Sequence, residues 1–225
     1  MKKTIFSLVF LLISCKNSSD EACDETNLVF ENPQPINDSE INRIPHKYAG
    51  RFINSDSTYL TILENCIYNE NFYKNKVSYT ELDSLKKEFK FEKEKLVDKD
   101  NAKIIFNYRF LKDSIELTYP KVDTVFAFSN FQKAKRINNQ LVINEKDSVF
   151  WKVKVVSIKN NLLKIKYFSF SNDLKKIDSI TRIKSKLVDS TKCILKPSRN
   201  EFKKIINSKT IGHEIEYKKL QNPNQ

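Results

Sequence analysis

Cys15 is the residue whose setting most clearly favours a defined chemistry. It follows the apolar run Ile5–Ile13 and the small residue Ser14, and the basic pair Lys2 and Lys3 precedes the run. A basic start, a short apolar stretch and a small residue at the cut are the three parts of a secretion signal. Nine helical residues reach about 14 Å, whereas a membrane core is about 30 Å thick. The run is therefore expected to be cleaved, which leaves a nucleophilic thiolate at the new N-terminus.

The tetrapeptide Leu12-Ile13-Ser14-Cys15 resembles the lipobox of bacterial lipoproteins. The resemblance implies that residues 1–14 are a cleaved signal peptide and that Cys15 carries a diacylglycerol thioether. Its freed amine can take a further fatty acyl chain such as palmitate. Two or three chains hold a protein firmly on a membrane, so the anchor should be durable. The alternative is a plain secreted protein in which Cys15 is buried or disulfide-bonded.

Four carboxylates lie within six positions shortly after this cysteine: Asp20, Glu21, Asp24 and Glu25. The cluster resembles the acidic export signal that follows the lipidated cysteine in surface lipoproteins of some gliding and gut-dwelling Gram-negative bacteria. The residue directly after the anchor is Lys16 and not Asp, which in enteric-type sorting implies transport to the outer membrane. We therefore expect a chain anchored in the outer membrane that faces the cell exterior. The alternative is that the carboxylates only keep a tether solvated.

The formal net charge of the chain is +12, and loss of Lys2 and Lys3 with the signal leaves +10. Basic chains with many aromatic residues can bind nucleic acid. An anchored envelope protein instead meets lipopolysaccharide phosphates and acidic glycans, and the lysines are scattered along the chain rather than packed in one block. The sequence thus favours a solvated basic face and an envelope protein or glycan as partner, with no nucleic acid.

Three cysteines remain once Cys15 is lipidated, so at most one bridge can form within the chain. Cys23 lies close to the anchor in a polar stretch, whereas Cys66 and Cys193 fall in strand-like segments. A Cys66–Cys193 disulfide would close a loop of more than a hundred residues and contribute about 4 to 5 kcal/mol in the chain-entropy model. The alternative is two unlinked cysteines that act as small apolar residues.

The domain organisation follows from composition. Residues 15–45 are polar and contain prolines, which predicts a flexible, lipid-anchored tether. Residues 46–210 are long enough for a single β-rich domain with a real core. The final segment, residues 211–225, is expected to be a polar C-terminal tail.

Period-2 alternation is the main structural signal. The run Val149–Val155 alternates apolar and polar residues, and Asn160-Asn161 then precedes a second alternating run, Leu163–Tyr167. Asparagine tolerates left-handed turn geometry, so the pattern predicts an antiparallel hairpin, and Asn138-Asn139 predicts another. Its buried positions should be Trp151, Val153, Val155, Leu163, Ile165 and Tyr167. Further expected strands are Thr58–Leu63, Cys66–Tyr79, Lys103–Arg109, Ser114–Tyr119, Val122–Ser129, Gln140–Asn144, Ile180–Val188 and Lys192–Lys196.

Helices are few. Thr80 with Asp83 resembles a capping box and predicts a helix over residues 80–90. Ser198 with Glu201 repeats that signature near the end, and a third, shorter helix is expected after Ser171. The expected fold class is α+β, mainly an antiparallel β meander in a twisted or partly closed sheet, with two or three short helices.

Catalytic motifs are not found in the sequence. Only two glycines occur in the chain, so neither a glycine-rich phosphate cradle nor a nucleophile elbow is expected. His213-Glu214 begins like a zinc metalloprotease motif, but Tyr217 stands where the second histidine is required. The other histidine, His46, could reach Cys66 only through the fold. We expect no catalytic residue, no metal and no cofactor.

The sequence therefore favours a non-enzymatic envelope lipoprotein that presents a binding or structural module on a tether. Two alternatives remain. Lys47–Phe52 is similar to the G-x-aromatic entry of lipocalin-like barrels, with Phe52 where that family usually has Trp, which implies a carrier of a small apolar ligand. The second alternative is an envelope hydrolase that uses two carboxylates in a cleft, with candidates that include Glu64, Glu70, Glu116 and Glu145.

Overall fold

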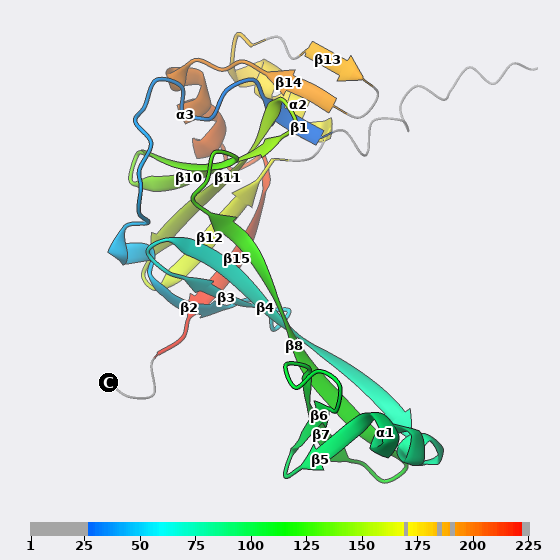
Figure 1. Cartoon of the computed structure of the whole chain (residues 1–225). Coiled ribbons are helices and arrows are strands. Elements are labelled where there is room, and N and C mark those ends of the chain that lie inside the picture. Colours follow the sequence, from blue (N-terminus) through cyan, green and yellow to red (C-terminus); the bar gives the residue numbers. More distant parts are fainter. Residues whose placement is uncertain (1–26, 169–170, 184–185, 190–191, 222–225) are drawn as a thin grey trace, which may run out of the picture.

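The computed structural model describes residues 27–168, 171–183, 186–189 and 192–221 (Figure 1). The lipobox, Cys15, Cys23 and the acidic cluster at residues 20–25 lie outside these ranges. The described chain is mainly β with a minority of helix, so a mainly β fold describes it more closely than the expected α+β class. Within the described residues, no helix is both long and apolar enough to cross a membrane.

One open, largely antiparallel sheet connects the strands in the order β13-β14-β1-β11-β12-β15-β2-β3-β4-β8-β7-β6-β5, with β10 and β9 branching from β11. The strands are β1 (Asn27–Phe30), β2 (Gly50–Ile53), β3 (Tyr59–Ile62), β4 (Cys66–Ser78), β5 (Phe89–Glu92), β6 (Lys95–Asp98), β7 (Ile105–Phe110), β8 (Ser114–Ala127), β9 (Gln132–Ile137), β10 (Gln140–Asp147), β11 (Phe150–Lys159), β12 (Leu162–Tyr167), β13 (Lys186–Asp189), β14 (Lys192–Leu195) and β15 (His213–Lys219). The pair β1–β14 is parallel. The helices are α1 (Leu82–Glu88), α2 (Ser171–Ile180) and α3 (Arg199–Asn207), with 3-10 turns η2 (His46–Tyr48) and η3 (Tyr79–Glu81).

The long antiparallel pair β4–β8 connects two parts of the molecule (Figure 1). Its ladder runs from Cys66 opposite Ala127 to Ser78 opposite Ser114. We refer to residues 71–76 and 118–124 as the stalk, to residues 77–117 as the distal lobe, and to the other described residues as the body. The distal lobe has its own small core, in which Val77, Leu96 and Ile115 pack under α1 and neighbouring aromatic rings.

The body buries side chains on both faces of its sheet. One cluster includes Trp151, Val153 and Val155 and lies under α2 and α3. The other includes Leu163 and Ile165. Five of the six expected hairpin core residues are therefore buried and Tyr167 is half-buried, but they divide between the two faces because Ile165 pairs with Val156 and not with Val155.

Local sequence signals are confirmed at several places. Asn160 and Asn161 have φ angles of 51° and 61°, and Asn138 and Asn139 have φ angles of 47° and 62°, so both Asn pairs form left-handed hairpin turns. Ser198 and Glu201 form the expected reciprocal capping box at the start of α3. The third expected helix is α2.

Other local expectations need correction. The expected capping box of Thr80 with Asp83 is wrong. The N-cap of α1 is Glu81, which makes no side-chain capping hydrogen bond, and α1 ends at Glu88. Ser78 caps the preceding turn η3, where its side chain accepts from the Thr80 N–H. The expected strand Ile180–Val188 is wrong at its start, because α2 continues through Ile180. The two strands expected on either side of Pro120 form the single strand β8. Proline is tolerated there because this part of β8 pairs only with β4, so no second partner needs its missing N–H.

Parts of the expected tether and of the expected tail lie in strands of the sheet. β1 starts at Asn27 and lies inside the sheet between β14 and β11, where Val29 and Phe30 are fully buried. β15 lies between β12 and β2, and its Tyr217 is buried. Residues 27–45 and 211–221 thus belong to the folded domain. The sequence did not indicate this, because their apolar runs are short and their strand partners lie far away in the sequence.

Of the two alternatives for Cys66 and Cys193, the disulfide is not formed, because Cys66 carries a free thiol. Cys66 begins β4 and Cys193 is buried in β14. Six strands separate β4 from β14 in the order of the sheet, so the two sulfur atoms cannot approach bonding distance without large backbone movement.

Candidate functional site

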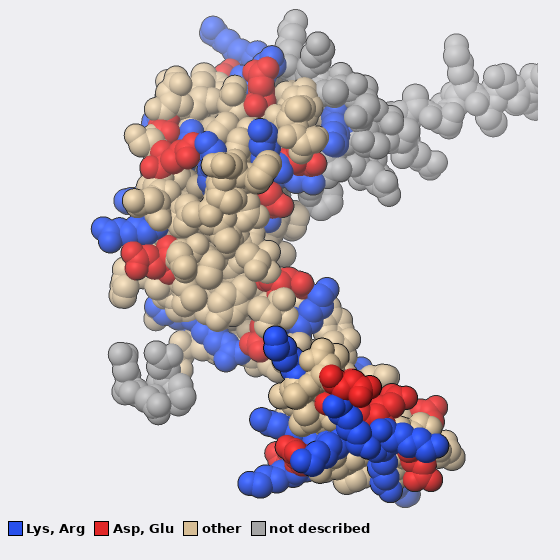
Figure 2. Space-filling view, in the orientation of Figure 1, with Lys and Arg blue, Asp and Glu red and all other residues tan. Residues whose placement is uncertain are grey.

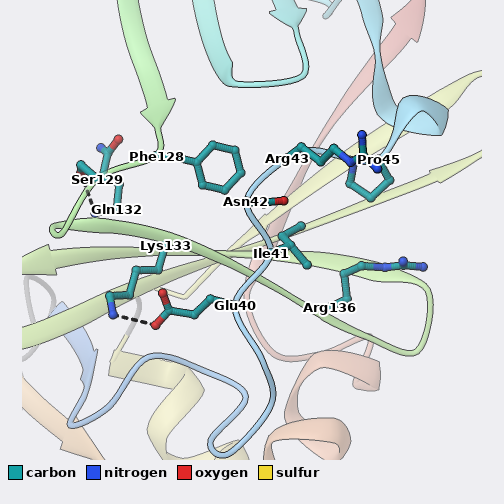
Figure 3. Close-up of a pocket in the computed structure, with 10 residues that line it drawn as sticks. All are labelled: Glu40, Ile41, Asn42, Arg43, Pro45, Phe128, Ser129, Gln132, Lys133 and Arg136. Atoms are coloured by element: carbon teal, nitrogen blue, oxygen red, sulfur yellow. Dashed lines mark hydrogen bonds and ion pairs between the residues drawn. The ribbon is translucent and has the colours of Figure 1, made fainter.

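A groove of about 680 Å³ runs along the outer edge of β9 (Figure 3). Its walls come from the segment before η2, the β8–β9 turn and β9 itself. The lining residues are Glu40, Ile41, Asn42, Arg43, Pro45, Phe128, Ser129, Gln132, Lys133 and Arg136. We refer to this hollow as the β9 groove and to residues 31–45 as the strap.

The strap is held in place by buried polar contacts. The backbone N–H of Gln34 donates to Asn144 Oδ1 at 2.6 Å, and Asn144 Nδ2 donates to the Gln34 carbonyl at 2.8 Å. Lys135 Nζ donates to the carbonyls of Pro33 and Pro35 at 3.1 and 2.9 Å. Burial lowers the pKa of the Lys135 ammonium, an effect that the charge of Glu40 opposes. These buried hydrogen bonds hold the strap to Lys135 of β9 and Asn144 of β10. Both residues lie 100 positions or more from their strap partners Pro35 and Gln34 in the sequence.

The part of the strap that lines the groove is also tied to its neighbours. The Arg199 guanidinium donates to both carboxylate oxygens of Asp38, at 2.7 and 3.0 Å. The backbone N–H of Ile41 donates to the Ala134 carbonyl of β9 at 2.9 Å. A two-point guanidinium–carboxylate pair and a backbone bridge hold the groove wall at a defined distance from β9.

The groove has more cationic than anionic groups. Its one lining carboxylate, Glu40, accepts from Lys133 Nζ at 2.6 Å, so that these two charges offset each other. Arg43 reaches Glu64 at 3.5 Å, but the two side chains are 75 % and 68 % exposed, so water screens the pair. Among the described residues, Arg136 makes no ion pair. The guanidinium groups of Arg43 and Arg136 are therefore the cations available to a ligand.

The charge of Arg136 affects the ionisation of its neighbours. Burial and then the Arg136 charge lower the pKa of the Lys47 ammonium. Burial raises the pKa of Tyr48 to about 12, and Arg136 opposes that rise. Lys47 Nζ and the Tyr48 hydroxyl both donate to the Asn139 carbonyl at 2.7 Å. The Lys47 ammonium and the Arg136 guanidinium repel each other. Together they give a positive potential that a bound anion would relieve.

Two neutral side chains in the β8–β9 turn present hydrogen-bond donors. Ser129 Oγ accepts from the backbone N–H groups of Phe131 and Gln132, at 3.2 and 3.0 Å, which leaves its hydroxyl proton to donate. Gln132 Oε1 accepts from the Ala127 N–H at 2.6 Å. Because the oxygen of Gln132 is engaged, its NH₂ group is the end that can serve a ligand.

One wall of the groove is apolar. Figure 3 shows the ring of Phe128 above Ile41, with Pro45 near Arg43. Phe128 is half-buried and packs edge-to-face on Phe126, with 4.9 Å between ring centroids. The ring therefore has a fixed position beside the donors, and the groove combines an apolar surface with a surplus of positive hydrogen-bond donors.

The carboxylates considered for hydrolysis lie in ion pairs. Glu70 pairs with Arg51 at 2.5 Å, Glu116 with Arg109 at 3.1 Å and Glu145 with Lys154 at 3.1 Å. On the β4–β8 ladder Glu70 faces Val122 and Glu116 faces Lys76. Glu70 and Glu116 are therefore six positions apart along the ladder, or about 20 Å. This distance is too long for a pair of glycosidase carboxylates.

The two histidines do not share a site. His213 begins β15 and stacks on the ring of Tyr167, with 5.1 Å between centroids, so the His213-Glu214 pair is on a strand and not on the helix that a zinc protease motif requires. His46 lies exposed in η2. No group of three or more His, Cys, Asp or Glu side chains with metal-binding geometry occurs in the described part of the chain.

None of the groove residues was singled out from the sequence. They come from two segments about ninety positions apart, residues 40–45 and 128–136, and carry no motif. The one local signal was the basic, amphipathic run Lys133–Ile137 directly before the Asn138-Asn139 turn. Comparison with protein-family models, curated proteins and solved structures found no match.

Proposed function

We propose that this chain is a lipid-anchored cell-envelope lipoprotein whose body binds acidic sugar units of envelope glycans in the β9 groove, without catalysing a reaction. The observation that carries the proposal is the chemistry of the lining. Arg43, Arg136, Ser129 and Gln132 all offer donors, while the only carboxylate is occupied by Lys133. Such a lining favours an acceptor-rich anion.

The apolar wall selects among anions. A sugar acid has a carboxylate for the guanidinium groups and a C–H face that can lie on the ring of Phe128. A free inorganic anion would use the donors and leave Phe128 and Ile41 without a contact. The mixed lining therefore supports an acidic pyranose rather than a bare phosphate or sulfate.

The charge distribution of the chain supports an anionic partner at the body. In the sequence, residues 27–70 and 125–221, which make up the body, contain 25 Lys and Arg against 14 Asp and Glu, whereas residues 71–124 contain 12 against 10. Figure 2 shows both signs of charge interspersed over the distal lobe. The excess positive charge thus belongs to the part of the molecule that contains the groove, where it would speed the approach of acidic glycans.

The lipidation of Cys15 and outer-membrane display remain part of the proposal. An anchored protein meets the acidic glycans of its own envelope, or those outside the cell, at high local concentration. Binding of one sugar unit would be weak, but several anchored copies on a long glycan would act together. A module of this kind needs no catalytic group.

The test uses the full chain and tetragalacturonate, a chain of four sugar acids, with its methyl ester as the uncharged control. Arg136→Gln should weaken tetragalacturonate binding about 10- to 100-fold, because a hydrogen bond to a charged group contributes about 1.5 to 3 kcal/mol. Arg182→Gln, which removes the same charge beyond α2, is the matched control and should leave the affinity within about twofold. Equal binding of the methyl ester, or equal loss in both variants, would contradict a site for acids in the groove.

The carrier alternative depends on Lys47–Phe52. In the described chain Tyr48 and Phe52 are both fully buried in the core cluster that includes Leu163 and Ile165, and η2 interrupts the approach to β2. These residues therefore support the wall behind the β9 groove. The same titration with a fatty acid in place of the glycan distinguishes a carrier from the proposed function.

A further inference from the structure

The stalk leaves the body along β4 and β8 (Figure 1). A second hollow, of about 510 Å³, is lined by residues at this point. It is formed by the β2–β3 turn and the adjoining part of β4 and β8, and the β9 groove has no residue in common with it. We refer to it as the stalk-root hollow. The residues that matter for its chemistry are Asp56, Tyr59, Asn71, Phe72 and Lys74.

Two aromatic rings form a corner in this hollow. The rings of Tyr59 and Phe72 lie 5.7 Å apart between centroids at an interplanar angle of 82°. The Arg51 guanidinium lies 4.6 Å from the Tyr59 centroid and is itself paired with Glu70, so the Tyr59 ring is held on that side. Phe72 is 42 % exposed although Tyr59 supports it. The result is a fixed ring with open apolar surface.

Phe72 takes no part in the aromatic stack of the stalk. That stack is formed by Tyr73 and Tyr119, which face each other across the β4–β8 ladder with 5.4 Å between ring centroids. Phe72 has the opposite orientation from Tyr73 and faces Pro120 across the ladder. An exposed ring without this cross-strand stacking role is a candidate contact for a ligand.

The polar groups around Phe72 include both acceptors and donors. Asn71 Oδ1 accepts from the Thr58 hydroxyl at 2.7 Å, which leaves the Asn71 NH₂ group to donate. Asp56 Oδ1 accepts from the Ser55 hydroxyl at 3.2 Å. The carboxylate makes no ion pair with any described residue, so its Oδ2 can accept from a ligand hydroxyl. Lys74 is 3.6 Å from Glu116, a long ion-pair distance for an exposed chain, and adds a donor.

This lining differs in kind from that of the β9 groove. A carboxylate acceptor beside an amide donor suits a hydroxyl group, which donates and accepts at once, and disfavours an anion. The open ring of Phe72 suits the C–H face of a pyranose. We propose that the stalk-root hollow binds a neutral pyranose unit of a glycan, with the sugar face on Phe72 and its hydroxyls on Asp56 and Asn71.

The test uses the full chain with cellotetraose, a neutral glucan whose rings have flat C–H faces, and with sorbitol, which has the hydroxyls without the ring. Ligand-observed saturation-transfer NMR measures binding. Cellotetraose should bind and sorbitol should not. Phe72→Leu keeps apolar bulk but removes the ring, and it should weaken binding about 2- to 10-fold, the size expected for loss of one aromatic stacking contact.

Two further variants separate this site from the rest of the molecule. Asp56→Asn should weaken cellotetraose binding at least threefold, whereas Phe110→Leu, at an exposed ring of the distal lobe, should not change it. Arg136→Gln should also leave cellotetraose binding unchanged, so the β9 groove and the stalk-root hollow are tested independently. Equal affinity for sorbitol, unchanged affinity in Phe72→Leu, or a loss confined to Arg136→Gln would each overturn the proposal.

Discussion

The backbone N–H and C=O of Gln34 pair with the side-chain amide of Asn144 through two hydrogen bonds in the interior, although the two residues lie 110 positions apart in sequence. Asn144 is fully buried on β10, and Gln34 is 1 % exposed in the strap. A single side chain thus serves both the N–H and the C=O of one strap residue, as a neighbouring strand would. The position of the strap, and with it one wall of the β9 groove, depends on this pair.

Asn144→Leu should destabilise the fold by about 2 to 4 kcal/mol, because it keeps the volume but leaves the backbone N–H and C=O of Gln34 buried without partners. Urea unfolding of the full chain measures the loss. Asn130→Ala, at an exposed position of the β8–β9 turn, is the control and should change stability by less than about 0.5 kcal/mol. A loss below about 1 kcal/mol for Asn144→Leu would mean that water replaces the pair and the strap is not fixed by it.

Asp173 gives the expected pH dependence a definite sign. Burial raises the pKa of its carboxyl above the ordinary value of 3.8, even though its Oδ2 accepts from the Gly212 N–H at 2.8 Å. The folded state therefore holds the proton more tightly than the unfolded chain. The resulting stability is fully present below about pH 4 and is lost as the pH rises through the raised folded-state pKa.

Asp173→Asn keeps an acceptor for Gly212 and removes the titration. The free energy of unfolding of the natural chain, minus that of the variant, should fall as the pH is raised from 3 to 7. Other carboxyl groups are common to both chains and cancel in this difference. A difference that increases with pH would show that the nearby lysines, and not burial, determine the pKa of Asp173.

Trp151→Ala should destabilise the body by about 3 to 5 kcal/mol, as expected when a large buried aromatic residue is truncated. Trp151 is 7 % exposed, lies in the cluster under α2 and α3, and pairs with Phe30 and Lys146 across its two ladders. The natural chain and the variant are compared in urea melts. Val149→Ala, two positions earlier and 67 % exposed, should cost less than about 0.5 kcal/mol. Similar losses for both would mean that this end of β11 contributes little to the core.

Features determined by neighbouring residues could be predicted from the sequence. The hairpin at Asn160-Asn161 needs only a left-handed turn between alternating runs, and the α3 capping box needs only Ser198 and Glu201 three positions apart. Both are local, and both are present. The predominance of β-strands could also be predicted, because period-2 alternation is the main pattern in the sequence.

Features that depend on distant partners could not be predicted. β1 has four residues and becomes a strand only because β14 and β11 supply both of its edges. The alternating pattern predicts that Lys166 faces solvent, but its side chain is buried. Its Nζ donates to the Ser208 carbonyl, just after the end of α3, at 2.7 Å. The β9 groove likewise unites the strap with β9, and no spacing rule connects Arg43 with Arg136.

The corrected start of the folded domain changes what is expected of the anchor. Since β1 begins at Asn27, it starts twelve positions after Cys15, and even a fully extended chain of that length reaches only about 40 Å. β1 and the distal lobe lie at opposite ends of the molecule (Figure 1). A lipid on Cys15 would therefore hold the body near the membrane and leave the distal lobe as the part farthest from it.

Surface display is the last prediction, and it depends on Asp20, Glu21, Asp24 and Glu25. If these carboxylates form an export signal, trypsin added to intact cells should digest the natural protein, and a version with Ala at all four positions should be protected until the cells are permeabilised. A transport machine can recognise such a cluster through complementary basic residues close to the membrane. Cys15→Ala is the lipidation control, because metabolic labelling with a fatty-acid probe should be lost there and retained in the four-Ala version. Digestion of the four-Ala version at the natural rate would show that the carboxylates only solvate the chain, and label persisting in Cys15→Ala would contradict the lipid anchor itself.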